Sequence, residues 1–395
     1  MGTRIVLYTG KGGVGKTSVA AASARAIAAS GRSTLVVSTD AAHSLADVLG
    51  APVGAEPTRL GPRLHALQLD DRAELTRHWS AVRAWASSTL VGRGVDRISA
   101  EELSVPPGLE ELLSLLRLVE LQRSGAFEVI VVDCAPTAET LRLLSFPDLA
   151  HWWLHRVVPR QDDLLGTFRP LARAVLDVTL PDRTVLDEVA RMMESLLAMR
   201  ALFVDREHVS MRLVTTADRV VVEESRRTFT ALGLHGVATD AIVVNRLFPE
   251  DVGPYFADWR DRQQDQLRGI EDAFAPVPVL RAPFFPREVV GDEALDRLAA
   301  ALFADRRPDE VLHHGLAREL EVDGDEARLR IAVPLADRDD VALRRAGDEL
   351  VVEVEGRRRA VLLPGAIAHY RPTGAALRDG VLTVTLRPPE AGEPA

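Results

Sequence analysis

Two lysines lie five residues apart in a glycine-rich loop near the start of the chain, and they are the only lysines among its 48 basic residues. Glycines let backbone amides turn toward phosphate oxygens, and an ammonium is a compact point charge that a guanidinium does not replace in a tight cradle. The spacing G-x-x-x-x-G-K-T is typical of a P-loop. We therefore expect a phosphate-binding loop made of Gly10, Lys11, Gly12, Gly13, Val14, Gly15, Lys16, Thr17 and Ser18.

The same loop predicts how a nucleotide and its metal ion would be held. A helix that begins at the loop adds positive potential at its N-terminus, which favours a phosphate. Lys16 is expected to reach the β- and γ-phosphates, and the Thr17 hydroxyl is expected to ligate Mg²⁺. The expected cofactors are ATP or ADP together with Mg²⁺. A glycine turn without nucleotide is the alternative, against which the strand–loop–helix context argues.

Two aspartates follow apolar runs that are typical of buried parallel strands. Asp133 comes directly after the run 129–132, where a Walker-B strand would present a carboxylate to Mg²⁺, directly or through water. Asp40 follows the run 33–38, and a carboxylate at this end of a strand points into the ligand crevice. We expect Asp40 to position the attacking water beside the metal, with capping of the next helix as the alternative.

The elements that must position these residues alternate between strand and helix. Strands are predicted over 4–8, 33–38, 129–133, 211–215, 241–244 and 276–280, and a helix over 18–30 that ends at Gly31. Such alternation predicts an α/β fold, a doubly wound parallel-sheet P-loop NTPase. The predicted domain covers residues 1–305.

A leucine-rich helical insertion of about residues 75–205 is expected inside this domain. Apolar residues recur at helical spacing over 109–121 and 186–203. Helical periodicity alone does not distinguish an open apolar groove from ordinary core packing, so both interpretations remain open.

The composition shifts near residue 305. A short helix of about 309–318 is expected within a linker of 306–318, and strict alternation with regular turns predicts an antiparallel all-β sandwich over 319–390. Nothing in this last module suggests catalysis.

Composition excludes several classes of protein. The chain has 395 residues, a net charge of −10 and a single cysteine, Cys134. One thiol forms neither an internal disulfide nor a cysteine-based zinc site, so we expect no zinc. No basic tract suggests nucleic-acid binding, and no signal peptide or membrane-spanning run is evident, which favours a cytoplasmic protein.

The motifs together resemble those of the ArsA/GET ATPases, which share a deviant Walker A sequence with MinD, ParA and the nitrogenase iron protein. The resemblance covers about residues 1–305 and rests on the loop 10–17, on Ser38–Asp47 and Asp133–Arg142 as switch I and switch II, and on the segments 243–245 and 283–291.

This resemblance implies a homodimer in which Lys11 reaches across to the partner's nucleotide and neutralises charge in the transition state. It also implies that Asn245 contacts adenine and that Pro283 and Phe284 belong to an adenine-side loop. In the family, the helices of the insertion form a groove for a transmembrane-helix-like client.

The sequence departs from the family pattern at several positions. Ala41 replaces a proline, and Ala138-Glu139 replace Gly-His in switch II. The C-x-x-C zinc clamp of the GET targeting factor and the cysteine cluster of the arsenite pump subunit are both missing. Thiolates are the soft ligands that As(III) would need.

The C-terminal stretch of about 319–388 resembles the α-crystallin domain of small heat-shock proteins. The parallels are Gly347–Val352 and Asp379–Val384, whereas the apolar I-x-I tail is missing. Large heat-shock-type assemblies are therefore not implied.

The resulting hypothesis is a homodimeric Mg-ATP-dependent ATPase that opens and closes to chaperone or target apolar protein clients. Two alternatives remain, an energy-coupling ATPase for arsenite or another oxyanion and a ParA/MinD-like switch. The sequence predicts no nucleic-acid partner and no integral membrane segment.

Overall fold

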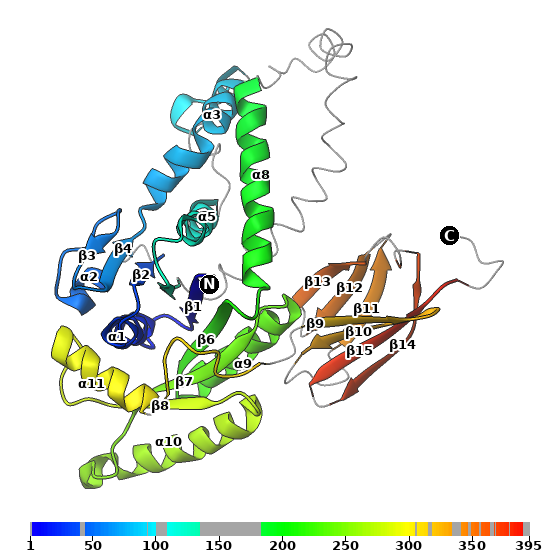
Figure 1. Cartoon of the computed structure of the whole chain (residues 1–395). Helices are drawn as coiled ribbons and strands as arrows, with labels where there is room; N and C mark the ends of the chain where they lie inside the picture. Colours follow the sequence, from blue (N-terminus) through cyan, green and yellow to red (C-terminus); the bar gives the residue numbers. More distant parts are fainter. Residues whose placement is uncertain are drawn as a thin grey trace. The chain divides into compact units, whose positions relative to one another are not determined.

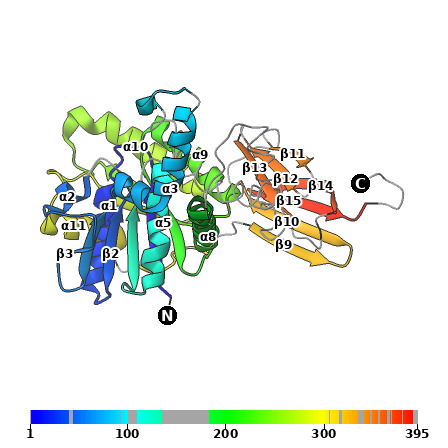
Figure 2. The same cartoon turned by 90° about the horizontal axis from the view of Figure 1, so that it is seen from above.

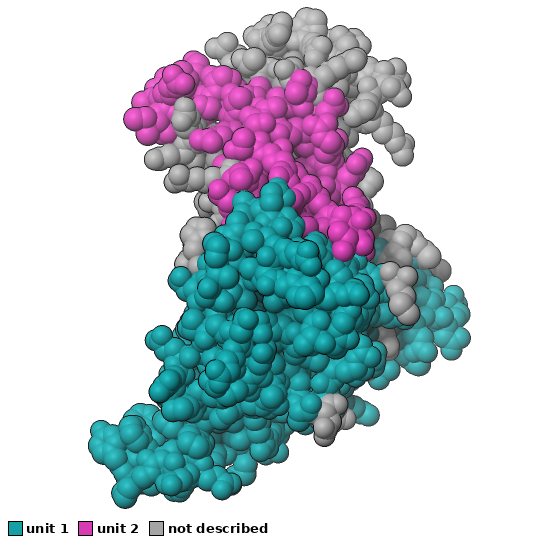
Figure 3. Space-filling model, turned by 60° about the vertical axis from the view of Figure 1, so that its left-hand side comes forward, with its two compact units in different colours: residues 1–68, 127–141, 203–395 teal, residues 69–126, 142–202 magenta. Residues whose placement is uncertain are grey.

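The computed structural model describes residues 2–39, 44–92, 94–99, 109–134, 183–304, 306–314, 318–333, 341–346, 349–354, 357–363, 367, 369–378 and 380–389. The chain divides into two compact units, which Figure 3 colours separately. The first comprises Met1–Gln68, Phe127–Leu141 and Phe203–Ala395, and the second comprises Leu69–Ala126 and Arg142–Leu202. The predicted boundaries at 305, 318 and 390 stay predictions.

The first unit contains a large sheet in the order β3-β4-β2-β5-β1-β6-β7-β8. All its neighbours run parallel except β3 and β4. The central strands are buried on both faces, which requires the continuous apolar runs that predicted them. The strands are β1 (Arg4–Thr9), β2 (Thr34–Ser38), β3 (Thr58–Arg59), β4 (Leu64–Gln68), β5 (Val129–Asp133), β6 (Val209–Thr216), β7 (Thr239–Leu247) and β8 (Val279–Pro283).

Helices cover both faces of this sheet, as the predicted doubly wound fold requires (Figures 1 and 2). On one face, α1 (Lys16–Ala29) and α11 (Asp292–Phe303) share an apolar core with the strands. On the other, α9 (Arg219–Leu234) and α10 (Gly253–Phe274) do the same. The short helix α2 (Ser44–Leu49) follows β2 and packs on α1.

The second unit is helical, as predicted for the insertion. It contains α3 (Asp71–Gly92), α5 (Leu109–Ser124) and almost all of α8 (Arg183–Phe203). Helix α3 packs on α5, and the backbone amide of Val82 donates to the Glu188 carboxylate on α8 at 2.9 Å. Helix α8 buries Met192, Leu196 and Met199 at a helical spacing, whereas Leu197 is exposed.

The C-terminal part forms two antiparallel sheets, β14-β15-β10-β9 and β11-β12-β13, and confirms the predicted all-β module. Side chains of both sheets share one core, and alternate residues of β15 are buried, as a half-buried strand requires. The strands are β9 (Arg318–Asp323), β10 (Glu326–Ala332), β11 (Val341–Ala346), β12 (Glu349–Val354), β13 (Arg357–Leu362), β14 (Arg371–Arg378) and β15 (Val381–Arg387).

The predicted linker helix of about 309–318 is wrong for the residues that the structure describes. Residues 311–314 have no helical hydrogen bonding, and β9 already begins at Arg318. A physical reason is that the side chains of the sheet hydrogen-bond the backbone at Asp309, Glu310 and Leu312, so that these groups do not need a helix to satisfy them.

Candidate nucleotide site

The loop between β1 and α1 lies at the carboxyl edge of the large sheet, where its sequence predicted it. Gly10 and Gly15 both have positive φ angles, of 152° and 94°. A Cβ atom at Gly10 would collide with the carbonyl oxygen of Val214, and one at Gly15 would collide with the Asn245 amide. Glycine is therefore needed at both positions for close packing as well as for backbone conformation.

Thr17 and Asp133, which lie 116 residues apart in the sequence, meet directly beside this loop. The Thr17 hydroxyl donates to Oδ2 of Asp133 at 2.7 Å and lies 3.2 Å from the Ser44 hydroxyl. The Ser38 hydroxyl donates to the same Asp133 oxygen at 3.5 Å. Hydroxyl and carboxylate oxygens are the ligand types that suit Mg²⁺, so this donor set fits the predicted ion.

Asp40 lies outside the described residues, so its predicted role as the water-positioning carboxylate stays a prediction. The same holds for most of switch II, including Ala138 and Glu139. Within the described ranges, no group of three or more His, Cys, Asp or Glu residues could hold a metal ion.

The two lysines have different surroundings. Lys16 is buried, and its ammonium donates to the backbone oxygen of Lys11 at 3.2 Å. Lys11 points to α9 instead, where its ammonium lies 3.3 Å from Oε2 of Glu224. More than a third of each side chain of this second pair is exposed to solvent.

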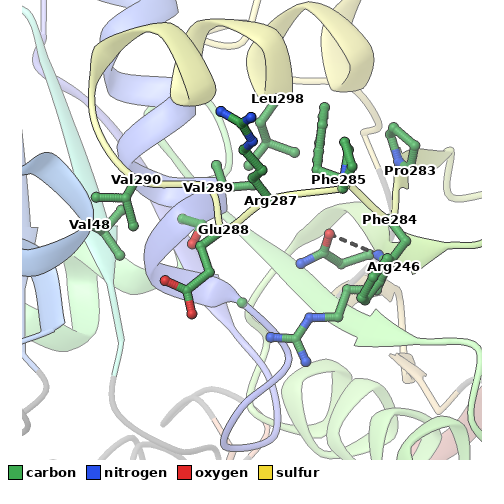
Figure 4. Close-up of a pocket in the computed structure, with 14 residues that line it drawn as sticks. Val48, Arg246, Pro283, Phe284, Phe285, Arg287, Glu288, Val289, Val290 and Leu298 are labelled. Atoms are coloured by element: carbon green, nitrogen blue, oxygen red, sulfur yellow. Dashed lines mark hydrogen bonds between the residues drawn. The ribbon is translucent and has the colours of Figure 1, made fainter.

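A pocket of about 560 Å³ joins the loop to the predicted adenine residues (Figure 4). Gly15, Ser18, Asn245, Pro283 and Phe284 all line it, so five predicted site residues from three segments lie together.

Asn245 occupies a defined position in this pocket. Its side-chain amide donates to the Val14 backbone oxygen at 2.9 Å, and its side-chain oxygen accepts from the Arg246 amide at 2.9 Å. Because the amide is hydrogen-bonded to the P-loop itself, Asn245 links the loop to the predicted adenine side of the pocket.

Charged residues also line the pocket. Arg287 and Glu288 come from the segment 283–291 that the resemblance indicated, and Arg246 comes from β7, so the wall carries charges of both signs (Figure 4). Sequence reasoning missed Arg246, which adopts a φ of 59°, uncommon for a residue with a side chain. Its position directly after Asn245 was the signal that could have identified it.

Cys134 is fully buried behind Asp133. Burial, reinforced by the negative charge of Asp133, raises the pKa of the Cys134 thiol far above its ordinary value, and Lys16 opposes this only in part. The thiol therefore stays neutral, which fits a small packing residue rather than a metal ligand.

No described helix has both the length and the apolar character needed to span a membrane.

Comparison with known proteins identifies two matching family models and several relatives of this chain. Residues 3–304 match the family model described as anion-transporting ATPase, and residues 324–386 match an HSP20-like domain found in ArsA. A protein of Prosthecochloris vibrioformis named "Putative arsenical pump-driving ATPase" is 33% identical over 383 residues, which cover 95% of this chain and 94% of that protein. The "ATPase get3" of Aspergillus terreus is 30% identical over 310 residues, which cover 76% of this chain and 90% of that protein.

Proposed function

The chain belongs to the anion-transporting ATPase family and is a P-loop ATP hydrolase, and on this premise we propose that it works as a Mg²⁺-dependent homodimer that handles apolar protein clients. ATP would close the dimer, and hydrolysis would open it and move the helices of the insertion. The chain carries an HSP20-like domain after its ATPase domain.

The observation that carries the Mg²⁺-dependent part of this proposal is the hydrogen bond between Thr17, which directly follows the P-loop lysine, and Asp133 at the end of β5. Thr17 and Asp133 would hold Mg²⁺, which would supply positive charge to offset that of the phosphates. Thr17 can donate its proton to Asp133 while a lone pair of its oxygen stays available, so the pair suits a metal-binding hydroxyl held by a carboxylate.

The other residues have separate roles in this proposal. Lys16 and the amides of residues 12–17 hold the phosphates, and Asp40 positions the attacking water. Asn245, Pro283 and Phe284 hold the adenine. Lys11 would leave Glu224 and neutralise charge at the nucleotide of the second subunit, so the pair seen in one chain would exchange for a contact between chains.

A client-binding role draws support from the helical unit and from a relative. The "ATPase get3" match covers most of that protein, and α8 exposes the apolar side chain of Leu197. Met192 and Met199 of the same helix are buried, so they would reach a client only after the helices of the insertion move. Methionine side chains adapt to varied apolar partners.

An arsenical pump is the second candidate, and the printed name of the Prosthecochloris relative favours it. The chemistry of this chain argues against an As(III) site built on thiolates, because its only cysteine is Cys134, whose pKa is raised by burial.

The substitution Asp40→Asn tests the hydrolytic mechanism. The variant should bind ATP as tightly as the wild-type protein, as measured by titration calorimetry, and should lose turnover by about 100-fold or more because water is no longer oriented. The exposed Asp258→Asn serves as a control for loss of one carboxylate. Turnover at the wild-type rate would remove Asp40 from the mechanism.

Client binding requires a second experiment with the full chain. ATPase rate and dimer state, the latter by light scattering, should be measured with a peptide that carries a transmembrane helix and with a control peptide whose apolar residues are replaced by serine. We expect ATP-dependent closure and co-purification of the first peptide alone. An active dimer that ignores both peptides but responds to arsenite would support the pump instead.

A further inference from the structure

The segment 306–314, which we call the strap, runs from α11 toward the β-module along the amino edge of the large sheet. Pro308 and Asp309 of the strap are buried, and Leu312 packs on the main core of the sheet. The strap thus differs from a flexible linker, whose residues stay solvated.

Side chains of three strands hold the strap by its backbone. Nε of Arg4 donates to the Asp309 carbonyl oxygen at 3.0 Å, and a terminal nitrogen of Arg212 donates to the Glu310 carbonyl oxygen at 3.0 Å. The Leu312 amide donates to Oδ2 of Asp240 at 3.2 Å. Because these contacts use backbone atoms, they fix the course of the strap independently of most of its side chains.

Asp240 is the centre of this attachment. It is the extra residue of a bulge in β7, since Met211 pairs with Thr239 and Arg212 pairs with Ala241. Its carboxylate accepts from Nε of Arg212 at 3.0 Å, from Ser210 at 2.8 Å and from Arg4 at 3.4 Å. A bulge commonly changes the direction of a side chain. Here the bulged residue is Asp240, and its carboxylate contacts side chains of β6 and β1.

A carboxylate of the strap itself, that of Asp309, also forms ion pairs. The Asp309 carboxylate pairs with Arg32 and with Arg307, the latter at 2.9 Å. Burial opposes the charge of this carboxylate, but hydrogen bonds from the two guanidinium groups outweigh it and hold the pKa of Asp309 below its ordinary value.

The network continues from Arg212 to the helix of the P-loop. A terminal nitrogen of Arg212 donates to the Tyr8 hydroxyl at 2.9 Å, and Tyr8 and Ser23 lie 2.6 Å apart. Ser23 donates its own proton to the Val19 carbonyl oxygen at 2.7 Å, so Tyr8 must donate to Ser23. The four side chains Asp240, Arg212, Tyr8 and Ser23 are all completely buried.

This arrangement is costly for a simple connection between domains. Burying a charge costs several kcal/mol unless it is paired and hydrogen-bonded, and here two guanidinium groups and a carboxylate are buried together. A solvated linker would join the same domains without that cost. The free-energy cost of burying these charges has a reason if the strap must keep one position relative to α1.

We propose that the strap is a docked part of the ATPase domain and that Tyr8 and Arg212 couple it to α1, so that nucleotide binding tightens its attachment. The inference rests on the nucleotide site proposed above. Phosphate binding at the first turn of α1 fixes that helix, and Ser23 lies on the same helix two turns later. The β-module, whose first strand begins at Arg318, comes next in the chain and is thereby held more firmly when nucleotide is bound.

Hydrogen exchange of the full chain, with and without Mg-ADP, tests the coupling. Nucleotide affinity is measured in parallel by titration calorimetry. In the wild-type protein, Mg-ADP should slow exchange of the strap amides, Leu312 above all, by about threefold or more. Tyr8→Phe should bind Mg-ADP but lose this slowing, since it removes only the hydroxyl that links Arg212 to Ser23.

Ser23→Ala breaks the same chain at its next link and serves if Tyr8→Phe does not fold. Its matched control is Ser225→Ala. Ser225 on α9 likewise lies within hydrogen-bond distance of the carbonyl oxygen four residues earlier and of a strand hydroxyl, that of Thr215, but it is outside the chain of bonds to the strap. The control should keep the nucleotide-dependent slowing.

Four results would overturn the proposal in whole or in part. Exchange of the strap at the rate of an unstructured peptide would show that it is not docked. If Mg-ADP binds but strap exchange is unchanged or faster, the coupling is overturned and the nucleotide site stays intact. If Mg-ADP slows strap exchange in both Tyr8→Phe and Ser23→Ala as much as in the wild-type protein, Tyr8 has no part in the coupling. Absence of any nucleotide binding would overturn the site and the coupling together.

Discussion

At the carboxyl edge of the large sheet, Lys11 pairs with Glu224 while more than a third of each side chain is exposed, whereas at the amino edge Arg212 pairs with Asp240 while neither is exposed at all. The loop after β1 and helix α9 carry the first pair, whereas strands β6 and β7 carry the second. An exposed pair contributes about 0–1 kcal/mol, so water or a ligand can replace either partner easily. A buried pair leaves an uncompensated charge when one partner is removed.

The difference follows from what each edge must do. At the carboxyl edge, the proposed function requires the lysines, Thr17 and Asp133 to exchange their present contacts for a nucleotide and its metal. At the amino edge, the contacts among Arg4, Arg212 and Asp240 are completed by the strap and need no ligand. Exchangeable contacts suit a catalytic site, and permanent contacts suit the attachment of a domain.

The largest expected effect is on stability at the amino edge. Asp240→Asn should lower the free energy of unfolding by about 3–5 kcal/mol, because Arg4 and Arg212 lose their shared counter-charge. Urea unfolding followed by circular dichroism measures this. Glu224→Gln is the matched carboxylate-to-amide change at the other edge, and equal losses in the two variants would contradict the contrast between the edges.

The next largest effect is on catalysis at the carboxyl edge. Lys16→Ala should lower kcat/KM for ATP hydrolysis by about 100- to 1000-fold, because a positive charge placed for the phosphates is lost. Steady-state ATPase assays measure the loss. Lys11→Ala should retain ATP binding in a calorimetric titration, because the Lys11 ammonium contacts Glu224 on α9 and does not line the pocket of its own chain. Loss of binding in Lys11→Ala but not in Lys16→Ala would reverse the two assignments.

Acid should weaken the docking of the strap. The pKa of Asp309 is lower in the folded chain than its ordinary value of 3.8, so the unfolded chain binds the proton first. The stability that Asp309 contributes is present above about pH 4 and is lost as the pH falls through the lowered pKa. The difference in urea midpoint between the wild-type protein and Asp309→Asn should therefore shrink with acidification.

Asp296 is the exposed counterpart for this measurement. Hydrogen bonding to Arg25 lowers its pKa too, but more than half of the side chain is exposed. Asp296→Asn should cost less stability at neutral pH than Asp309→Asn, within about 1 kcal/mol of the wild-type protein. A greater loss in Asp296→Asn would mean that burial does not set the strength of these pairs.

The smallest effect concerns Glu224 itself. Glu224→Gln should change the free energy of unfolding by less than about 1 kcal/mol, because the pair with Lys11 is largely solvated. It should modestly raise the ATPase rate at high protein concentration, since Lys11 would no longer be held on its own subunit. A measurable fall in that rate would show that Glu224 assists the reaction rather than restrains Lys11.

Sequence reasoning was most successful where local chemistry is obligatory. The P-loop, the strand before Asp133 and the alternation of the C-terminal strands each depend on neighbours in the chain, and the structure has all three. The short linker helix was predicted from local pattern alone and is wrong, because Asp240, Arg4 and Arg212 satisfy the backbone of the strap from distant strands.

Residue types and spacing by themselves determined the P-loop, the strand that ends at Asp133 and the order of the α/β and all-β parts, and they predicted Thr17 and Asp133 as the residues beside the metal. Only the tertiary structure decided that Arg212 and Asp240 would be buried together and that the strap would dock against them. An arginine in a strand says nothing about its burial, since the cost of burying its charge is offset only by partners that folding brings from elsewhere in the chain.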